Sequence, residues 1–407
     1  MKKVLVVGGG AAGMMAAFFA AENGNEVVLA EKNEKLGKKI YITGKGRCNL
    51  TNDVPVAEFF GNVVNNPKFL YGSIYSFSPE NVCAFFEKRG LTLKTERGNR
   101  VFPASDKASD VTKTLEKALR SAGVRIILET EIVAVSVNDG AVNGAVTRKN
   151  EFLEADSVII CTGGASYPLT GSTGDGYEFA KACGHSIVSP KPALVGIELK
   201  GRDFLPLQGL SLKNVRLTVF DGNKKIFGDF GEMLFTHYGI SGPIVLTCSS
   251  YVNRLNLEKL TASVDLKPVL TDEVLDNRLL REFAENRTKT ISAVVRSLVP
   301  STLVELIVKR SRTPSAKICA EITKEERKRI IFTLKNLTFR IKALRPLEEA
   351  IVTSGGVSVS EVNPKTMESK KVKGLFFAGE VLDVDCLTGG FNLQAAFSTG
   401  YVAGKNA

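Results

Sequence analysis

Three glycines and one acid near the start of the chain have the spacing of a site for nucleotide phosphates. Gly8, Gly10 and Gly13 form a GxGxxG pattern between a short apolar run and an Ala-rich stretch that predicts a helix. In this pattern the first glycine permits a tight turn, the second lets the backbone approach a pyrophosphate, and the third lets helix and strand pack closely. The free N–H groups at the helix start would face the phosphates. Glu31 follows 23 positions after Gly8, where an acid would bind the adenosine ribose hydroxyls. These residues predict a dinucleotide site.

The segment after Glu31 favours FAD over NAD. Residues 32–52 form a loop rich in glycine and lysine, and such loops after the ribose acid are typical of FAD enzymes. Cations of this loop would meet phosphate or substrate charge. Cys48 is either a reactive thiol or a packed small residue, and packing is the more common role. We expect the loop to contribute Lys32, Gly37, Lys38, Gly46, Arg47 and Cys48 to the cofactor site.

A second buried run would return the chain to the same cofactor. It ends in Thr162, Gly163 and Gly164. In FAD enzymes of the two-dinucleotide-domain type, a strand that ends in this way reaches the cofactor, and the glycines allow close approach of the backbone. We include all three residues in the predicted site.

The C-terminal part of the chain has a similar pattern, an apolar run followed by glycines. An apolar run ends at Gly379 and Glu380, and then Gly389 and Gly390 precede a predicted helix that begins near Asn392. The N-terminus of that helix would direct its dipole at the flavin and stabilise the reduced ring. The alternative is a terminal helix that only packs on the sheet. The adjoining glycines and acid favour the flavin interpretation.

Few side chains remain for acid–base chemistry. His185 lies near the end of a predicted helix and is expected to be a core or helix-terminal residue, whereas His237 lies in a loop punctuated by Gly and Pro, where function is more common. We name His237, Cys386 and Cys48 as candidate catalytic residues. The seven cysteines are odd in number and include no CxxC pair, which argues against a disulfide framework or a zinc ribbon and favours a reducing cytoplasm. We predict no metal site and no membrane span.

The length of the chain suggests two or three domains. Residues 1–192 and 345–407 are predicted to form one α/β, Rossmann-like FAD-binding domain of the two-dinucleotide-binding-domain type. Residues 193–268 alternate strand-like runs with turns and predict an inserted β-barrel, completed by a returning strand near residues 337–344. Residues 269–336 have helical spacing and predict an inserted, basic helical subdomain.

Basic charge is concentrated in this insertion. The whole chain has a net charge of +11, and residues 271–345 alone contain 17 Lys and Arg against 9 Asp and Glu. A surface of this kind attracts polyanions, nucleic acid above all. Basic helices also occur simply as solvated faces. Both interpretations stay open at this point.

Several motifs occur together, in order, along essentially the whole chain. They are GGGAAG with Glu31, TGKGRCNLTN, RVFPASDKASDV, CTGGASYPLTGSTGDGY, FTHYGISGP, TSGGVSVSEVNPKTMESK and AGEVLDVDCLTGGFNLQAAFSTGYVAG. With them the chain resembles the HI0933-like, or BaiN-like, family of flavoproteins. The resemblance implies non-covalent FAD and an FAD domain interrupted by a small β-barrel and a helical bundle.

The resemblance also implies which residues line the cofactor. By motif position they are Gly8, Gly10, Ala11, Ala12, Gly13, Glu31, Lys32, Thr162, Gly163, Gly379, Glu380, Asn392 and Leu393. Val133 would offer backbone contacts to adenine, and residues 353–357 would lie near the isoalloxazine ring. Cys386 and Leu387 depart from the family pattern, in which this stretch is often Gly-rich or polar.

Activities attached to the family include reduction of uridine to dihydrouridine in ribosomal RNA, oxidation of small amines and reduction of steroid-like enones. The basic insertion favours the RNA activity. NAD(P)H, bound transiently without a second Rossmann domain, would reduce the flavin, and N5 would deliver hydride to C6 of an unpaired or flipped-out uridine in large-subunit ribosomal RNA. The alternatives are a small-molecule oxidase or enone reductase and a non-catalytic RNA-binding flavoprotein. No oligomeric state is predicted.

Overall fold

A computed structural model describes all residues from 1 to 407, and they form two compact units. Unit 1 comprises residues 1–193 and 346–407, and unit 2 comprises residues 194–345. The division predicted from the sequence, at 192/193 and 344/345, lies within one residue of these points. Each unit has its own hydrophobic core. No helix of the chain combines the length and the apolar character needed to cross a lipid bilayer.

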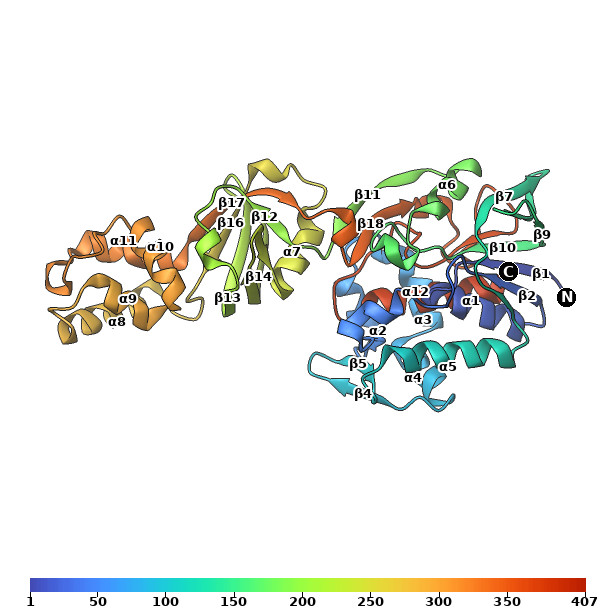
Figure 1. Ribbon diagram of the computed structural model, residues 1–407, viewed down its shortest axis with the longest axis horizontal. Coiled ribbons are helices and arrows are strands. Elements are labelled where there is room, and N and C mark those ends of the chain that lie inside the picture. Colours follow the sequence, from blue (N-terminus) through green and yellow to red (C-terminus); the bar gives the residue numbers. More distant parts are fainter. The chain divides into compact units, whose positions relative to one another are not determined.

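A parallel sheet in the order β19-β10-β1-β2-β6 forms the centre of unit 1 (Figure 1). Its strands are β1 (Lys3–Val7), β2 (Glu26–Ala30), β6 (Arg125–Ile127), β10 (Ser157–Ile160) and β19 (Leu375–Phe377). Such strands are buried on both faces, which explains why the runs in β1 and β10 are almost wholly apolar. Since all strands are parallel, the carboxyl ends of β1, β10 and β19 meet at one edge, although they come from opposite ends of the sequence.

Two helices at opposite ends of the chain pack directly on each other. They are α1 (Ala11–Glu22) and α12 (Phe391–Asn406). A Cβ at Gly400 would lie 2.4 Å from the carbonyl oxygen of Ala12, and a Cβ at Gly404 would lie 2.2 Å from that of Ala16. The two backbones are therefore so close that only glycine fits on α12 at these positions.

Smaller elements complete unit 1. The further strands are β3 (Thr51–Asn52), β4 (Leu93–Glu96), β5 (Arg100–Pro103), β7 (Ile132–Asn138), β8 (Ala141–Thr147), β9 (Phe152–Glu154), β11 (Ile187–Ala193) and β18 (Val352–Val357). The further helices are α2 (Val56–Phe59), α3 (Tyr71–Ser76), α4 (Pro79–Glu87), α5 (Ala108–Ser121) and α6 (Asp175–Ala182). β11 and β18 are antiparallel partners, with Ala193 opposite Val352. The chain leaves unit 1 after β11 and returns just before β18.

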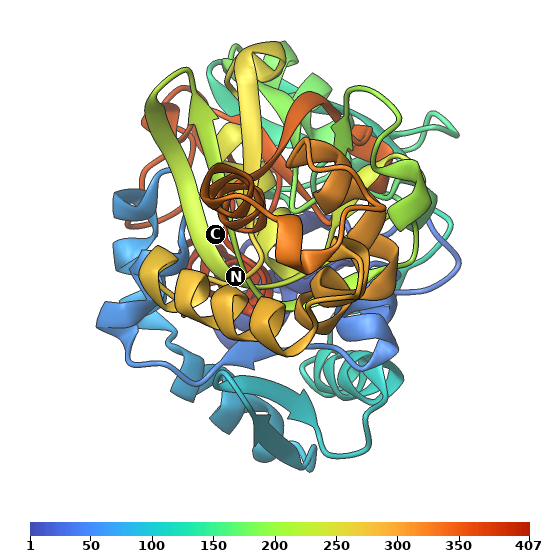
Figure 2. The same cartoon turned by 90° about the vertical axis from the view of Figure 1, so that its left-hand side faces the viewer.

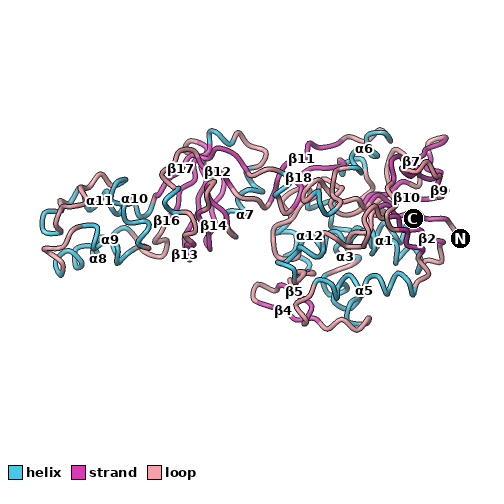
Figure 3. Tube along the Cα trace, in the orientation of Figure 1, coloured by secondary structure: helices cyan, strands magenta, loops and turns pink.

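Unit 2 contains a closed barrel in the order β12-β15-β14-β13-β16-β17 (Figure 3). Its strands are β12 (Ile197–Leu199), β13 (Ser211–Asp221), β14 (Lys224–Phe235), β15 (Gly239–Ser241), β16 (Leu260–Asp265) and β17 (Leu337–Leu344), with α7 (Pro243–Val252) between β15 and β16. Between β16 and β17 the chain forms α8 (Asp272–Glu285), α9 (Ile291–Leu298), α10 (Ser301–Arg310) and α11 (Lys324–Lys335), seen from a second direction in Figure 2. The returning strand near residues 337–344 is β17, which closes the barrel.

Candidate cofactor site

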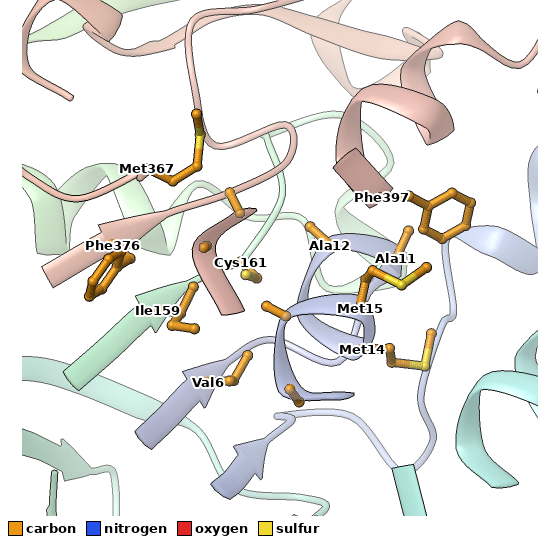
Figure 4. Packing of buried hydrophobic residues seen from close by; sticks show 14 of the residues in the cluster. Val6, Ala11, Ala12, Met14, Met15, Ile159, Cys161, Met367, Phe376 and Phe397 are labelled. Atoms are coloured by element: carbon orange, nitrogen blue, oxygen red, sulfur yellow. The ribbon is translucent and has the colours of Figure 1, made fainter. Parts of the chain in front are cut away.

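The first glycine pattern forms a tight turn between β1 and α1. Gly8 has a φ of +103°, and a Cβ there would lie 2.6 Å from the carbonyl oxygen of Cys161, which follows β10. A Cβ at Gly13 would lie 1.8 Å from the carbonyl oxygen of Gly8, so α1 packs directly on the turn. Figure 4 shows Ala12 and Met15 of α1 among the neighbouring buried side chains. By contrast, a Cβ at Gly10 would meet no atom within 4 Å. The turn thus leaves room for a phosphate to approach the N–H groups at the start of α1.

Glu31 follows β2 beside this turn, and N–H groups hold its carboxylate in place. One carboxylate oxygen accepts from the backbone of Gly9 at 2.7 Å, and the other accepts from the backbone and side-chain amide of Asn33 at 2.8 and 2.6 Å. A carboxylate can accept at about four positions, so these bonds orient Glu31 and leave capacity for a ribose hydroxyl. The residue is buried, which keeps water from competing for it.

The segment after β10 reaches the same edge of the sheet. The hydroxyl of Thr162 is buried and has no hydrogen-bond partner. Gly163 has a φ of +76°, and a Cβ at Gly164 would lie 2.4 Å from the hydroxyl oxygen of Thr353. An unsatisfied buried hydroxyl costs roughly 1–3 kcal/mol, so a ligand atom is the partner to expect at Thr162.

Glu380 is at the centre of a polar network that the sequence reveals only in part. Its carboxylate accepts from Lys39 Nζ at 2.7 Å, from Ser166 Oγ at 3.1 Å and from the backbone N–H of Thr353 at 2.8 Å. The hydroxyl of Thr353 in turn accepts from the backbone N–H of Ala165 at 2.9 Å. Lys39 and Glu380 are each about one-fifth exposed. Thr353 belongs to the segment expected near the isoalloxazine ring and Lys39 to the loop cations expected to meet phosphate or substrate charge, whereas Ala165 and Ser166 were not predicted. No local spacing indicates that any of them meets Glu380.

Tyr177 is a further residue that sequence reasoning missed, although it lies in the quoted GDGY motif. Its side chain on α6 is almost fully buried, and its hydroxyl lies near the side chain of Thr353 without forming a hydrogen bond of standard geometry. Burial and the neighbouring carboxylates of Glu380 and Asp383 raise the pKa of Tyr177 well above its usual range. The group is therefore a neutral donor at neutral pH.

These observations together fit FAD. The open space at Gly10 faces a helix N-terminus suited to pyrophosphate, and the fixed carboxylate of Glu31 suits a ribose. The unpartnered hydroxyls of Thr162 and Tyr177 are donors and acceptors for which a polar ligand would provide partners.

The C-terminal segment is shaped by close contacts and by one side chain. A Cβ at Gly390 would lie 2.3 Å from the carbonyl oxygen of Thr51. Asn392 accepts from the backbone N–H of Cys386 at 2.9 Å and donates to the carbonyl oxygens of Cys386 and Leu387 at 2.8 and 3.2 Å. Asn392 therefore holds together the loop that departs from the family pattern. Its contact with FAD stays a prediction.

The other predicted cofactor residues have varied surroundings in unit 1. The three loop cations are bonded within the protein: Lys32 to Thr173 and Asp175, Lys38 to Asn33 and Glu34, and Arg47 to Glu96 and Asp106. Positive φ angles occur at four of the predicted glycines, Gly37, Gly46, Gly379 and Gly389. Ala11 and Ala12 are buried at the start of α1, and Leu393 packs against the core. Val133, by contrast, is exposed on β7. Because the cations already have partners, their contact with FAD also stays a prediction.

The three candidate catalytic residues lie in different surroundings. Cys48 and Cys386 are fully buried in the core of unit 1, and burial raises the pKa of Cys48 to about 12 and raises that of Cys386 as well. Both thiols are therefore protonated at neutral pH. His237 is exposed in unit 2, with its ring against Tyr238. His185 is buried, and its Nε2 lies 2.8 Å from Ser369 Oγ, as expected for a core histidine.

Comparisons with known proteins cover the whole chain. A family model described as the HI0933-like protein Rossmann domain matches residues 2–406. A 3-dehydro-bile acid delta(4,6)-reductase from Clostridium scindens is 31% identical over 412 residues, which cover 100% of this chain and 99% of that protein. A ribosomal RNA dihydrouridine synthase from Haemophilus influenzae is 31% identical over 402 residues, which cover 98% of this chain and 96% of that protein.

A solved structure gives the same result for the fold. The 3-ketosteroid-delta4-(5alpha)-dehydrogenase from Rhodococcus jostii RHA1 matches with a TM-score of 0.50 at 15% identity, covering 100% of this chain and 96% of that one. The predicted fold class, a Rossmann-like α/β domain with an inserted barrel and helices, is confirmed.

Proposed function

Because this chain belongs to the HI0933-like family and is an FAD-dependent oxidoreductase, we propose that it reduces a carbon–carbon double bond conjugated with a carbonyl group. We further propose that the substrate is uridine in ribosomal RNA. The names of two relatives support the reaction class, since a delta(4,6)-reductase acting on a 3-dehydro bile acid and a dihydrouridine synthase both add hydrogen across such a bond. FAD, when bound, supplies this chemistry by taking two electrons from a reductant and passing a hydride on. NADPH or NADH is the proposed transient reductant.

The charge of unit 2 is the observation that favours RNA. Residues 272–296 contain five basic and five acidic side chains, whereas residues 297–345 contain twelve basic and only four acidic ones. The excess of basic over acidic side chains therefore lies on α10, α11, β17 and their connections, and not on α8 or α9. A small enone with at most one negative charge gains little from such a surface, but a polyanion gains both affinity and faster association.

The residues of the chain would divide the binding and proton chemistry between them. The N–H groups at the start of α1 would hold the pyrophosphate and Glu31 the ribose, while the network around Glu380 keeps its donors oriented. A proton must also reach the carbon that does not receive the hydride. Burial raises the pKa of the Cys48 and Cys386 thiols, which makes them poor proton donors. Of the three candidates only His237 has an exposed side chain, and we propose it as the donor.

A second candidate function is reduction of a small conjugated enone such as a steroid. One observation favours it: the bile acid reductase is as similar to this chain as the H. influenzae dihydrouridine synthase, at 31% identity, and it matches over the full length of both chains. Sequence identity therefore does not decide between the two substrates.

One experiment separates the two functions. Flavin-loaded protein is incubated without oxygen with NADPH or NADH and either unmodified ribosomal RNA transcript or a 3-oxo-4,6-diene bile acid, and products are analysed by mass spectrometry. Our proposal expects dihydrouridine in the RNA and no reduced steroid. Reduction of the steroid alone would replace it with the second candidate. Deleting the gene should remove a dihydrouridine from the RNA map of the source organism, and an unchanged map would contradict the proposal.

A further inference from the structure

The exposed face of α11 combines cations with a large aromatic ring. Phe332 lies four residues after Lys328 and three after Arg329, so the three side chains share one side of the helix, opposite the buried Ile330 and Leu334. The exposed acid Glu325, three residues before Lys328, lies on the same side. Phe332 is 65% exposed. A single exposed aromatic side chain is common on protein surfaces, so its meaning depends on its neighbours.

Hydrogen bonds connect this face to further cations. The guanidinium of Arg329 donates to the carbonyl oxygen of Arg312 at 3.5 Å, in the turn after α10. Arg310, at the end of α10, donates to the carbonyl oxygen of Thr338 on β17 at 2.6 Å. Thr338 and Arg340 both point outward from the barrel and are about 7 Å apart, as residues two positions apart on a strand must be. We call the surface formed by Arg312, Lys328, Arg329, Phe332 and Arg340 the α11–β17 strip.

The cations of the strip are available, unlike others on the same elements. Arg327 and Lys335 of α11 form salt bridges with Asp276 and Asp265, at 2.6 and 2.8 Å. Arg312, Lys328 and Arg340 are exposed and form no salt bridge, and Arg329 bonds only to backbone carbonyl oxygens. Lys328, after Arg327, helps to lower the pKa of Asp276, but it makes no direct salt bridge. Exposed charges without a direct salt bridge can exchange their counterions for phosphates at little cost.

We propose that the α11–β17 strip binds single-stranded RNA, with its cations on phosphates and Phe332 stacked on a base. This inference rests on the proposed function and names the surface that would hold the RNA substrate. Cations beside an exposed aromatic ring are the combination by which proteins bind single strands without reading sequence. A membrane surface would instead call for several apolar side chains on one helix face, and Phe332 stands alone among polar neighbours on this face of α11.

The test measures binding of fluorescein-labelled oligouridine by the full, flavin-loaded chain at several salt concentrations. The strip variant R312Q/K328Q/R340Q removes three charges whose side chains make no hydrogen bond in the protein. The matched control R281Q/R287Q/K289Q removes three exposed, unpaired charges near the end of α8. The slope of log affinity against log salt should fall by about two in the strip variant, since each single-strand phosphate contact contributes about 0.7, and should not change in the control.

A second variant tests the stacking. Phe332→Ala should weaken oligouridine binding about tenfold without changing the salt slope, because a stacked base contributes no counterion release. Equal losses in the two triple variants, or unchanged binding in the strip variant or in Phe332→Ala, would overturn the inference. So would wild-type binding to phosphatidylserine vesicles but not to oligouridine.

The inference and the proposed function fail in different ways. Binding that depends on the strip, together with no dihydrouridine formed in ribosomal RNA, would remove the proposed function alone. Dihydrouridine formed at the wild-type rate, with an unchanged KM for RNA, in the strip variant would remove the inference alone. Equal melting temperatures of the two triple variants exclude unfolding as the cause of a loss.

Discussion

The cofactor site of unit 1 and the α11–β17 strip of unit 2 differ in how their charged side chains are held. In unit 1, Glu31 accepts three N–H bonds and Glu380 is paired with Lys39, whereas in unit 2 Lys328 and Arg340 stand exposed without a salt bridge. A small cofactor is held best by groups that are oriented before it arrives, because ordering them on binding costs free energy. A polyanion is held well by accessible charges that release counterions. Substitutions of the groups that shape the turn at Gly13 or the network around Glu380 should therefore change folding and cofactor binding together, and those on the strip should change neither.

Among these substitutions, Gly13→Ala should have the largest effect. Its Cβ would lie 1.8 Å from the carbonyl oxygen of Gly8, and neither backbone can move without separating α1 from β1. We expect a loss of about 4 kcal/mol or more in the free energy of unfolding, and loss of bound flavin. Denaturant unfolding and the flavin absorbance of purified protein measure both. Gly61→Ala, where a Cβ meets nothing within 4 Å, should behave like the wild type.

Glu380→Gln should have the next largest effect. It removes the charge that Lys39 faces and weakens three hydrogen bonds at once, so we expect about 1.5–3 kcal/mol of destabilisation and weaker FAD binding. The control is Glu131→Gln, which breaks the ion pair with the largely exposed Arg148 and should cost no more than about 1 kcal/mol. Equal effects of the two substitutions would mean that the network around Glu380 has no special role.

The stability of unit 1 should depend on pH through Glu361, whose carboxylate accepts hydrogen bonds in the folded protein. Burial raises its pKa, but hydrogen bonds from Lys371 and Ser186 outweigh this and lower the pKa from 4.5 to about 2. Because the folded pKa is the lower one, the stabilisation is complete above the unfolded value and is lost as pH falls from about 4.5 towards about 2. Melting temperatures measured across this range should fall less steeply for Glu361→Gln than for the wild type. An unchanged slope would contradict the assignment.

Tyr177→Phe separates folding from cofactor binding within unit 1. Because the hydroxyl has no partner in the protein, the cofactor-free variant should be as stable as the wild type or slightly more so. FAD affinity should fall by about fivefold to tenfold, the value of one hydrogen bond of about 1 kcal/mol. Isothermal titration with FAD and melting of the cofactor-free protein measure the two effects. A less stable cofactor-free variant would show that the hydroxyl is bonded within the protein.

The smallest expected effect is the one on folding of unit 2. R312Q/K328Q/R340Q changes exposed side chains that take part in no hydrogen bond or salt bridge, so each should alter the free energy of unfolding by less than about 0.5 kcal/mol. Chemical denaturation of this variant beside the wild type checks this. A loss of unfolding free energy as large as that of Glu380→Gln would show that the strip charges contribute to folding, as the charges around Glu380 do.

The parts of the site that are local in sequence could be predicted, and the parts that depend on distant contacts could not. The turn at Gly8 and Gly13 follows from spacing alone, because strand, turn and helix are consecutive. The bond between Lys39, which follows β2, and Glu380, which follows β19, joins residues 341 positions apart, and only the parallel order β19-β10-β1-β2 brings their segments together. The class of the fold was thus within reach of the sequence, whereas the donors around Glu380 were not.

Burial is the other quantity that the sequence did not provide. Cys48 lies in a loop of glycines and cations, yet the structure places its thiol wholly in the core. Arg47, next to it, has two acidic partners, Glu96 and Asp106, which lie on another part of the chain. A residue type in a suggestive motif therefore indicates what chemistry is available, but not whether solvent or a ligand can reach it.

The pairing of β11 with β18 has a consequence for how this kind of protein can diversify. Ala193 lies opposite Val352, so the two chain crossings into unit 2 start from neighbouring strands. Inserted segments whose ends are close together are the ones that a host domain tolerates. Unit 2 can therefore be lengthened, shortened or exchanged without rebuilding the sheet that positions Glu31 and Glu380. Under our proposal that unit 2 binds the substrate, exchange of this one unit would change the molecules that the protein acts on while the FAD-binding domain stays the same.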